Sequence, residues 1–239
     1  LPMKYKAFYI SGDVEYRETE AKDARIQKLY EIRNSGREEI MELPTGCTDI
    51  RCLFDGNRFR LEICPSLEAK SSERLAGFLT CVGIRLRPGV RLAGQVGEED
   101  RRRLLHRMTG PLSPPQKLAA LEEFLGRGRL AEPEYPVNDI LELVERQRGS
   151  VNVEDLAAAL SCSRRYLEIA FKRDMGIPIK KYAGIVKLQN ALVMLAEGRD
   201  DYYGGLAYYD QSHFIREFKK YMSVTPGQYR RNMGRRAVV

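Results

Sequence analysis

Two short stretches of the sequence combine polar side chains that can hydrogen-bond to a nucleobase with apolar side chains at helical spacing. In the second of them, Asp210 is suited to cap a helix, and Phe214, Phe218 and Tyr221 then recur at intervals of four and three residues. This spacing predicts a helix with one buried aromatic face. A short basic helix held by aromatic anchors suits insertion into a DNA major groove. Its outer face would carry Gln211, Ser212, Arg216, Glu217 and Lys220.

The other stretch, over 153–173, repeats this design. Leu156 and Leu160 share one face of a predicted first helix over 153–160, and a turn follows over 161–163. Ser163 is suited to cap a second helix, which Leu167, Ala170 and Phe171 would anchor. The residues left on its outer surface are Arg164, Arg165, Glu168, Ile169 and Lys172.

A long helix is predicted between the two stretches, over 179–196. Its apolar residues have helical spacing, Pro178 marks its start, and Gly198 follows its end. Such a helix is roughly 27 Å long at 1.5 Å per residue. One turn of B-DNA is about 34 Å, so helices at both ends of this connector could enter successive major grooves. One chain would then recognise two adjacent half-sites.

Together with Thr225-Pro226-Gly227-Gln228-Tyr229-Arg230, these stretches resemble the C-terminal double helix-turn-helix domain of the AraC/XylS family of bacterial transcription regulators. The resemblance covers about 135–233 and implies two kinds of DNA contact. Contacts with bases are implied for Arg165, Glu168, Ile169, Gln211, Ser212 and Arg216. Contacts that position the phosphate backbone are implied for Ser163, Arg164, Lys172, His213, Lys219 and Lys220.

Two features depart from the family pattern. Ser161 occupies the turn position where members usually have glycine, which takes positive φ without strain. In the second unit, the expected first helix over 199–208 is shortened and contains Gly204 and Gly205. Each glycine costs roughly 1 kcal/mol relative to alanine in a helix interior. We therefore expect the first unit to contribute most of the sequence specificity.

The N-terminal region has the pattern of a β-rich domain. Asp55-Gly56 between two apolar segments is typical of a hairpin, whereas 21–33 fits a helix and a strand equally. The segments 44–50 and 83–89 are similar to two motifs of a small cupin-like domain found at the N-terminus of some AraC-type regulators. The predicted strands are 6–10, 39–43, 50–54, 58–63 and 80–86.

The predicted fold class is α+β. We expect a β-rich sensory or oligomerisation domain over 1–92, a helical connector and linker over 93–134, a DNA-binding domain over 135–233, and a frayed basic tail over 234–239. The predicted connector helices could close the β-rich core or form a dimer seam. The predicted helices outside the two stretches are 98–108, 114–125 and 136–148.

The cysteines favour neither a disulfide framework nor a zinc site. Their number is odd, their spacing is irregular, there is no Cys-x-x-Cys pair, and the only histidines are His106 and His213. Ordinary buried thiols are favoured over a thiol sensor, which would centre on the first four. We expect no cofactor and no metal. The cysteines are Cys47, Cys52, Cys64, Cys81 and Cys162.

The net charge of +7 is concentrated from Tyr135 onward, which slightly favours a polyanionic partner. No apolar run approaches the length needed to cross a bilayer, and there is no signal peptide, so we expect a soluble, cytoplasmic protein without a membrane partner. The expected function is sequence-specific regulation of transcription, and the resemblance implies activation. The expected partners are double-stranded DNA and RNA polymerase, with a small-molecule effector at an unknown site and a homodimer as further options.

Two alternatives stay open at this point. The chain could bind DNA constitutively, without a small-molecule effector, because a ligand pocket leaves no mark in the periodicity of a β-rich domain. It could also be an enzyme, such as a cysteine-based DNA-repair protein, fused to a DNA-binding module. The enzyme alternative is disfavoured because 1–130 contain no Ser/His/Asp arrangement, phosphate-binding glycine loop or paired-carboxylate motif.

Overall fold

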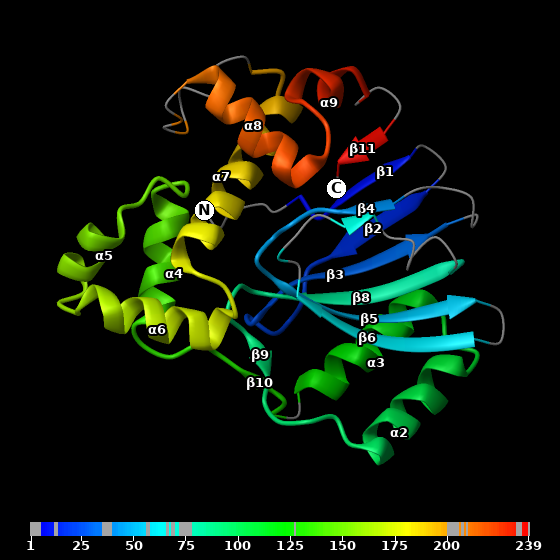
Figure 1. Ribbon diagram of the computed structural model, residues 1–239. Coiled ribbons are helices and arrows are strands. Elements are labelled where there is room, and N and C mark those ends of the chain that lie inside the picture. The colour runs from blue at the N-terminus through cyan, green and yellow to red at the C-terminus, as the bar shows by residue number, and fades with distance from the viewer. Residues whose placement is uncertain are drawn as a thin grey trace.

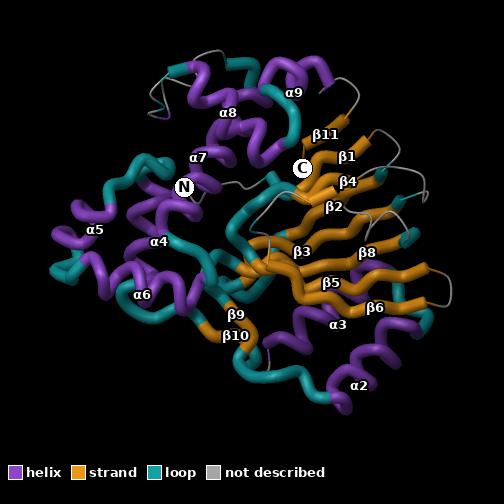
Figure 2. The backbone as a smooth tube through the Cα atoms, viewed as in Figure 1, coloured by secondary structure: helices purple, strands orange, loops and turns teal. Residues whose placement is uncertain are grey.

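The computed structural model describes residues 6–11, 14–34, 40–55, 58–65, 67, 70–71, 78–126, 128–199, 206, 208, 210–232 and 236–238. Strands dominate the N-terminal region, and helices dominate from residue 98 onward (Figures 1 and 2). The strands are β1 Phe8–Ser11, β2 Glu15–Thr19, β3 Ile26–Arg33, β4 Ile40–Glu42, β5 Thr48–Asp55, β6 Arg58–Pro65, β7 Lys70–Ser71, β8 Thr80–Leu86, β9 Arg91–Leu92, β10 Leu130–Ala131 and β11 Arg236–Val238. The helices are α2 Glu98–Thr109, α3 Pro114–Gly126, α4 Val137–Arg146, α5 Val153–Ala159, α6 Arg164–Met175, α7 Ile179–Ala196, α8 Gln211–Met222 and α9 Pro226–Asn232.

The largest sheet is antiparallel and has the strand order β2-β3-β8-β5-β6. Strands β5 and β6 form the predicted hairpin, with Asp55 paired with Arg58. The ambiguous segment 21–33 contains the strand β3, because its residues pair with β2 on one side and β8 on the other. A smaller antiparallel sheet has the order β11-β1-β4-β7, and β9 pairs with β10.

One face of the large sheet packs on α2 and α3, which lie along it in Figure 1. Side chains alternate along a strand, so Ile50 and Cys52 of β5 face this helical layer together with Ile84 of β8. Leu121 and Leu125 of α3 complete the same core. The connector helices therefore close a β-rich core, as one of the two sequence alternatives proposed.

The opposite face of the sheet contains buried ion pairs. The Arg51 guanidinium lies 3.0 Å from the carboxylates of both Glu42 and Glu62, and Arg85 Nε lies 3.0 Å from Asp49 Oδ1. The Arg51, Arg85 and Asp49 side chains are almost fully buried. Charged groups are costly to bury unless they are paired, so these contacts explain how the interior tolerates them.

The helices α4 to α9 form a second core around α7. Tyr182, Ile185 and Leu192 of α7 are buried in it, together with Phe171 of α6 and Phe218 of α8. Because α6 and α8 both pack on α7, this core fixes the position of α6 relative to α8. The fold class is thus the predicted one: an antiparallel β region followed by a helical region.

The two regions are in direct contact. The amide of Gln189 on α7 forms hydrogen bonds with the backbone of Lys6 and Pro44. Gly46 lies against the Tyr182 ring, and Gly89 lies against Pro133 and Leu141. Both glycines have positive φ and fall within the segments 44–50 and 83–89. These two segments therefore meet the helical region.

The C-terminal strand β11 pairs with β1, from Tyr9–Val238 to Ser11–Arg236. The expectation of a frayed tail is therefore wrong for 236–238, because an edge strand of the smaller sheet provides backbone partners. Figure 1 shows β11 beside β1, near the point where the chain enters the sheet. The proposed domain boundaries at 92, 134 and 233 stay predictions.

Candidate nucleic-acid interface

The first helix-turn-helix unit consists of α5, the turn 160–163 and α6. The side chain of Asn152 caps α5 by accepting a hydrogen bond from Glu154 N at 2.9 Å, and Ser163 caps α6 by accepting from Tyr166 N at 3.2 Å. These bonds satisfy backbone N–H groups that a helix start leaves unpaired. Ser161 has a φ of 51°, so it adopts the left-handed conformation for which glycine is usual.

The outer face of α6 carries the predicted residues. Leu167, Ala170 and Phe171 are buried, so the helix can present only its opposite side to a partner. Arg164 Nε lies 3.0 Å from Glu168 Oε1, and Arg164 also pairs with Glu154 of α5. The exposed residues on this face are Ser163, Arg164, Arg165, Glu168, Ile169 and Lys172.

In the second unit, α8 has the same construction. Asp210 Oδ1 accepts a hydrogen bond from His213 N at 2.6 Å, which caps the helix start. Phe214, Phe218 and Tyr221 are buried, as their spacing predicts. His213 is half-buried, with its ring 5.7 Å from that of Tyr208. The exposed predicted residues are Gln211, Ser212, Arg216, Lys219 and Lys220.

The predicted irregular first helix of the second unit, with Gly204 and Gly205, lies almost wholly outside the described residues. The helix α9 after α8 is described and begins with a reciprocal cap. Thr225 Oγ1 accepts from Gln228 N at 3.2 Å, and Gln228 Oε1 accepts from Thr225 N at 2.8 Å. The ring centroid of buried Tyr229 lies 5.6 Å from that of Phe218, so α9 packs against the buried face of α8.

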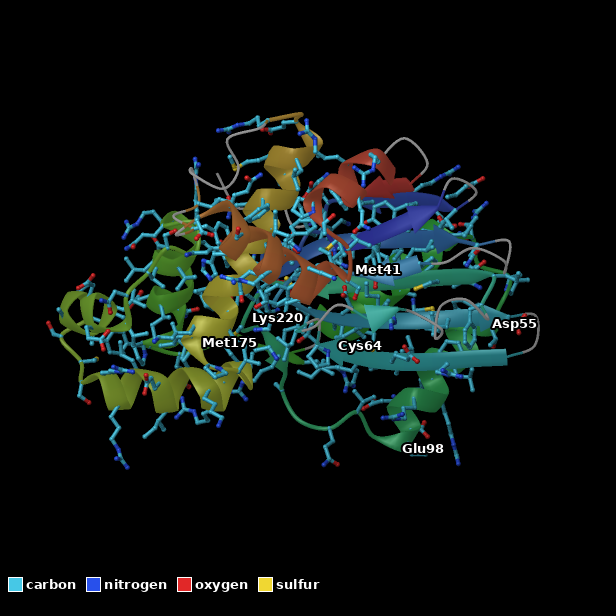
Figure 3. All side chains as sticks on the ribbon, turned by 45° about the horizontal axis from the view of Figure 1, so that its top comes forward. Met41, Asp55, Cys64, Glu98, Met175 and Lys220 are labelled. Carbon is cyan, nitrogen blue, oxygen red and sulfur yellow. The ribbon has the colours of Figure 1, made fainter. Side chains whose placement is uncertain are left out.

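A pocket of about 670 Å³ lies between the start of α7 and the end of α8. Lys180 and Lys181 contribute to its lining from α7, and Lys220 does so from α8. Figure 3 labels Lys220 on α8 and Met41 on β4 of the smaller sheet. The two α7 lysines are absent from the predicted set, because the start of a connector helix gives no signal of exposure toward a partner. Glu217 is the acidic residue of this lining.

Tyr166 is another exposed residue that the predicted set omits. Its side chain is 49% exposed on α6, close to the 56% exposed Tyr135. The Tyr135 hydroxyl donates to Leu160 O at 2.7 Å and lies 3.3 Å from Cys162 Sγ, which raises the Tyr135 pKa. A search for polar side chains alone could not have found this aromatic pair beside the first turn.

The cysteines are free thiols, and Cys47, Cys52 and Cys81 are buried. Burial raises the pKa of Cys47 and of Cys52 to about 12 and raises that of Cys81 as well. A reactive thiol needs an accessible thiolate, so these three have the environment of core residues. The carboxylates of Asp49 and Glu42 lie near Cys81 and are already paired with arginines.

The C-terminal region is similar in sequence to known proteins. Residues 156–232 match the family model described as a helix-turn-helix domain. The F1 operon positive regulatory protein of Yersinia pestis is 36% identical over 99 residues, which cover 39% of this chain and 33% of that protein. The transcriptional regulator MtrA of Neisseria gonorrhoeae is 25% identical over 100 residues, covering 41% of this chain and 33% of that protein.

Solved structures that match this chain include the C-terminal domain of AraT, a response regulator from Geobacillus stearothermophilus. It has a TM-score of 0.40 and 23% identity over 43% of this chain and 88% of that one. ToxT from Vibrio cholerae has a TM-score of 0.42 and 12% identity over 94% of this chain and 98% of that one. The chain spans about a third of the length of the two curated relatives above.

The paired, capped helices around α7 and the family match define the C-terminal region as a DNA-binding helix-turn-helix domain. The domain is of the AraC type, and its relatives are regulators of transcription. These relatives belong to a family of regulators rather than of enzymes. Among the described helices, none is long and apolar enough to cross a membrane.

Proposed function

We propose that the chain is a sequence-specific transcription regulator that places α6 and α8 in adjacent major grooves of one DNA duplex. The observation that carries this proposal is the shared packing of both helices on α7, which leaves their polar faces outward. The 18 residues of α7 span roughly 27 Å, close to the 34 Å or so between successive major grooves.

The polar residues of the two outer faces suit recognition of base edges. Arg165 and Arg216 can each form two hydrogen bonds with guanine, Gln211 can pair with adenine, and Glu168 can accept from cytosine N4. A good two-bond contact discriminates against a wrong base by roughly 1–3 kcal/mol. Ser212 can bond to several bases, so we expect it to add less specificity.

Polar and basic residues around these faces suit contacts with phosphates, which set the register of the protein on DNA. This set consists of the predicted Ser163, Arg164, Lys172, His213, Lys219 and Lys220, to which we add Lys180 and Lys181 from the pocket. The pocket lies between the start of α7 and the end of α8, and we expect the duplex to present its backbone there. We expect Arg164 to act partly by neutralising Glu168, since the two are already paired.

We further propose that the β-rich region controls the DNA-binding region through their shared contacts at α7. Activation, with RNA polymerase as a partner, is favoured by the name of the Yersinia pestis relative, a positive regulatory protein. A regulator that acts on chromosomal DNA works in the cytoplasm.

A second candidate function is constitutive DNA binding without a small-molecule effector. The buried ion pairs of Arg51 and Arg85, with the Tyr30 ring packed over Gly83, fill space where a ligand could lie, which favours this candidate. Thermal shift of the full chain against a metabolite panel separates the two. A ligand at 100 times its Kd adds about 2.7 kcal/mol of stability, whereas a constitutive regulator gives no such shift.

The proposed function is tested by selecting bound sites from a random DNA pool with the full chain, Arg165→Ala and Arg216→Ala. Two half-sites about ten base pairs apart, each degraded by one substitution, are the expected result. A single half-site that is insensitive to Arg216→Ala would restrict base recognition to the first unit. The absence of any preferred sequence across a salt titration would overturn the proposed function.

A further inference from the structure

The outer face of α6 exposes large apolar side chains as well as charges. Tyr166 and Ile169 lie on α6, and Tyr135 lies close to Tyr166. Ile169 is 57% exposed, the largest value among these residues. Within the described part of the chain, the exposed large hydrophobic side chains are Ile63, Leu79, Leu105, Tyr135, Tyr166 and Ile169. Half of them therefore gather at one recognition helix, which calls for a partner.

The position of Ile169 on the helix favours DNA as that partner. Residues four before and three after it lie on the same helical ridge, and these are Arg165 and Lys172. Both are exposed, while Leu167 and Phe171 point into the core. An apolar residue between two cations suits a polyanion that offers apolar groups between its charges.

The acidic residue next to Ile169 is held in an ion pair. Glu168 is paired with Arg164 at 3.0 Å, and Arg164 also contacts Glu154. Arg164 is shared between the carboxylates of Glu154 and Glu168, so it offsets one of these two negative charges. A DNA backbone approaching Ile169 would meet the flanking cations Arg165 and Lys172, while the Glu168 carboxylate lies against Arg164.

We propose that Ile169 recognises the 5-methyl group of a thymine in the half-site bound by the first unit, an inference that rests on the proposed function. In the major groove, thymine presents a methyl group that cytosine, adenine and guanine lack. Ile169 lies one helical turn, about 6 Å, beyond Arg165 along α6. We therefore expect this thymine about two base pairs from the guanine that Arg165 contacts.

The test uses the half-site selected from the random pool and replaces each thymine, one at a time, with deoxyuridine. This change removes the methyl group and keeps every hydrogen-bonding group. Burial of one such carbon is worth about fourfold in affinity. We expect the full-length protein to lose about this factor at one thymine, and Ile169→Ala to bind both DNAs equally.

Lys172→Ala is the matched control on the same ridge. It should weaken binding to the thymine and deoxyuridine DNAs by the same factor, because a phosphate contact does not sense the methyl group. Equal binding of the unaltered protein to both DNAs at every position would overturn the inference, as would undiminished discrimination by Ile169→Ala. Both results are distinct from failure of the proposed function, in which no half-site is selected at all.

A contact with a protein partner is the competing role for Ile169. In that case Ile169→Ala would keep the thymine preference on purified DNA and lose transcription in a reconstituted assay with RNA polymerase. This combination would also overturn the inference.

Discussion

The side-chain amide of Gln189 pairs with both backbone groups of Lys6, a residue 183 positions earlier in the chain. Gln189 Oε1 accepts from Lys6 N at 2.6 Å, and Gln189 Nε2 donates to Lys6 O at 2.8 Å and to Pro44 O at 2.8 Å. The side chain is completely buried. A helix residue thus provides the backbone ahead of β1 with the partners that a neighbouring strand would supply.

Replacing Gln189 with leucine should destabilise the protein markedly. Each buried backbone group left without a partner costs roughly 1–3 kcal/mol, and the substitution leaves more than one. Urea unfolding of the full chain measures the loss. Asn190→Leu is the control, because the Asn190 amide bonds to Val186 O within its own helix. Equal stability of the two variants would show that the Gln189 bonds do not hold the regions together.

The contact between Gly46 and Tyr182 can be separated from backbone strain by a pair of alanine substitutions. Gly46 and Gly94 both have positive φ, but a Cβ at Gly46 would lie 2.6 Å from Tyr182 Cε2, whereas one at Gly94 has nothing within 4 Å. Gly94→Ala should show the strain alone. Gly46→Ala should lose a further 1–3 kcal/mol or so, as overpacked cores do. Thermal or urea unfolding that gives equal losses would contradict the packing described at this junction.

Removing the charge of Glu168 should strengthen non-specific binding to DNA. Glu168→Gln removes one of the two carboxylates that share Arg164, the other being Glu154, and so makes the guanidinium more available to a phosphate. The slope of log K against log salt should steepen by about 0.9, the value for one phosphate contact on B-DNA. Fluorescence anisotropy on a random duplex over a range of salt gives this slope. Glu99→Gln removes a similar pair with Arg103 on α2 and should leave the slope unchanged.

The thiols should differ in reactivity according to burial. At pH 8, iodoacetamide should modify Cys64 and Cys162 in the folded protein, and Cys47, Cys52 and Cys81 only after unfolding. Mass spectrometry of peptides after timed labelling gives the order. Rapid labelling of Cys47 in the folded protein would contradict its burial.

The raised pKa values of the buried cysteine thiols predict that the protein loses stability at alkaline pH. Burial raises the pKa of Cys52 from 9.0 to about 12. Between pH 9 and pH 12 the Cys52 thiol therefore stays protonated in the folded protein and loses its proton in the unfolded chain. Its contribution is therefore fully present below pH 9 and falls as the pH rises toward 12. Cys52→Ala should show a shallower decline of unfolding free energy with pH than the unaltered chain.

Local signals were sufficient to predict the recognition helices. Ser163 and Asp210 form the caps that their residue types indicate, and Phe214 and Phe218 are buried as their spacing requires. The roles of the outward residues toward DNA stay predictions. A helix start and an apolar stripe depend on residues within a few positions, so sequence patterns describe them well.

Features that depend on distant partners were not predictable in this way. The segment of β3 places Ile26, Leu29 and Tyr30 at helical spacing, and only its pairing with β2 and β8 makes it a strand. The residues of β11 carry no local strand signal, because their partner β1 lies at the other end of the chain. Gln189 did offer a signal, since it interrupts the apolar stripe of α7 between Ile185 and Leu192.

The pairing of β11 with β1 has a mechanical consequence for the helical region. A module attached at one end can swivel about a single hinge, but this one follows β10, which pairs with β9, and ends in β11, which pairs with β1. Its motion relative to the sheet then has few degrees of freedom. A displacement of β1 would therefore pull on the helical region at two points together, through β11 and through the contact between Lys6 and Gln189.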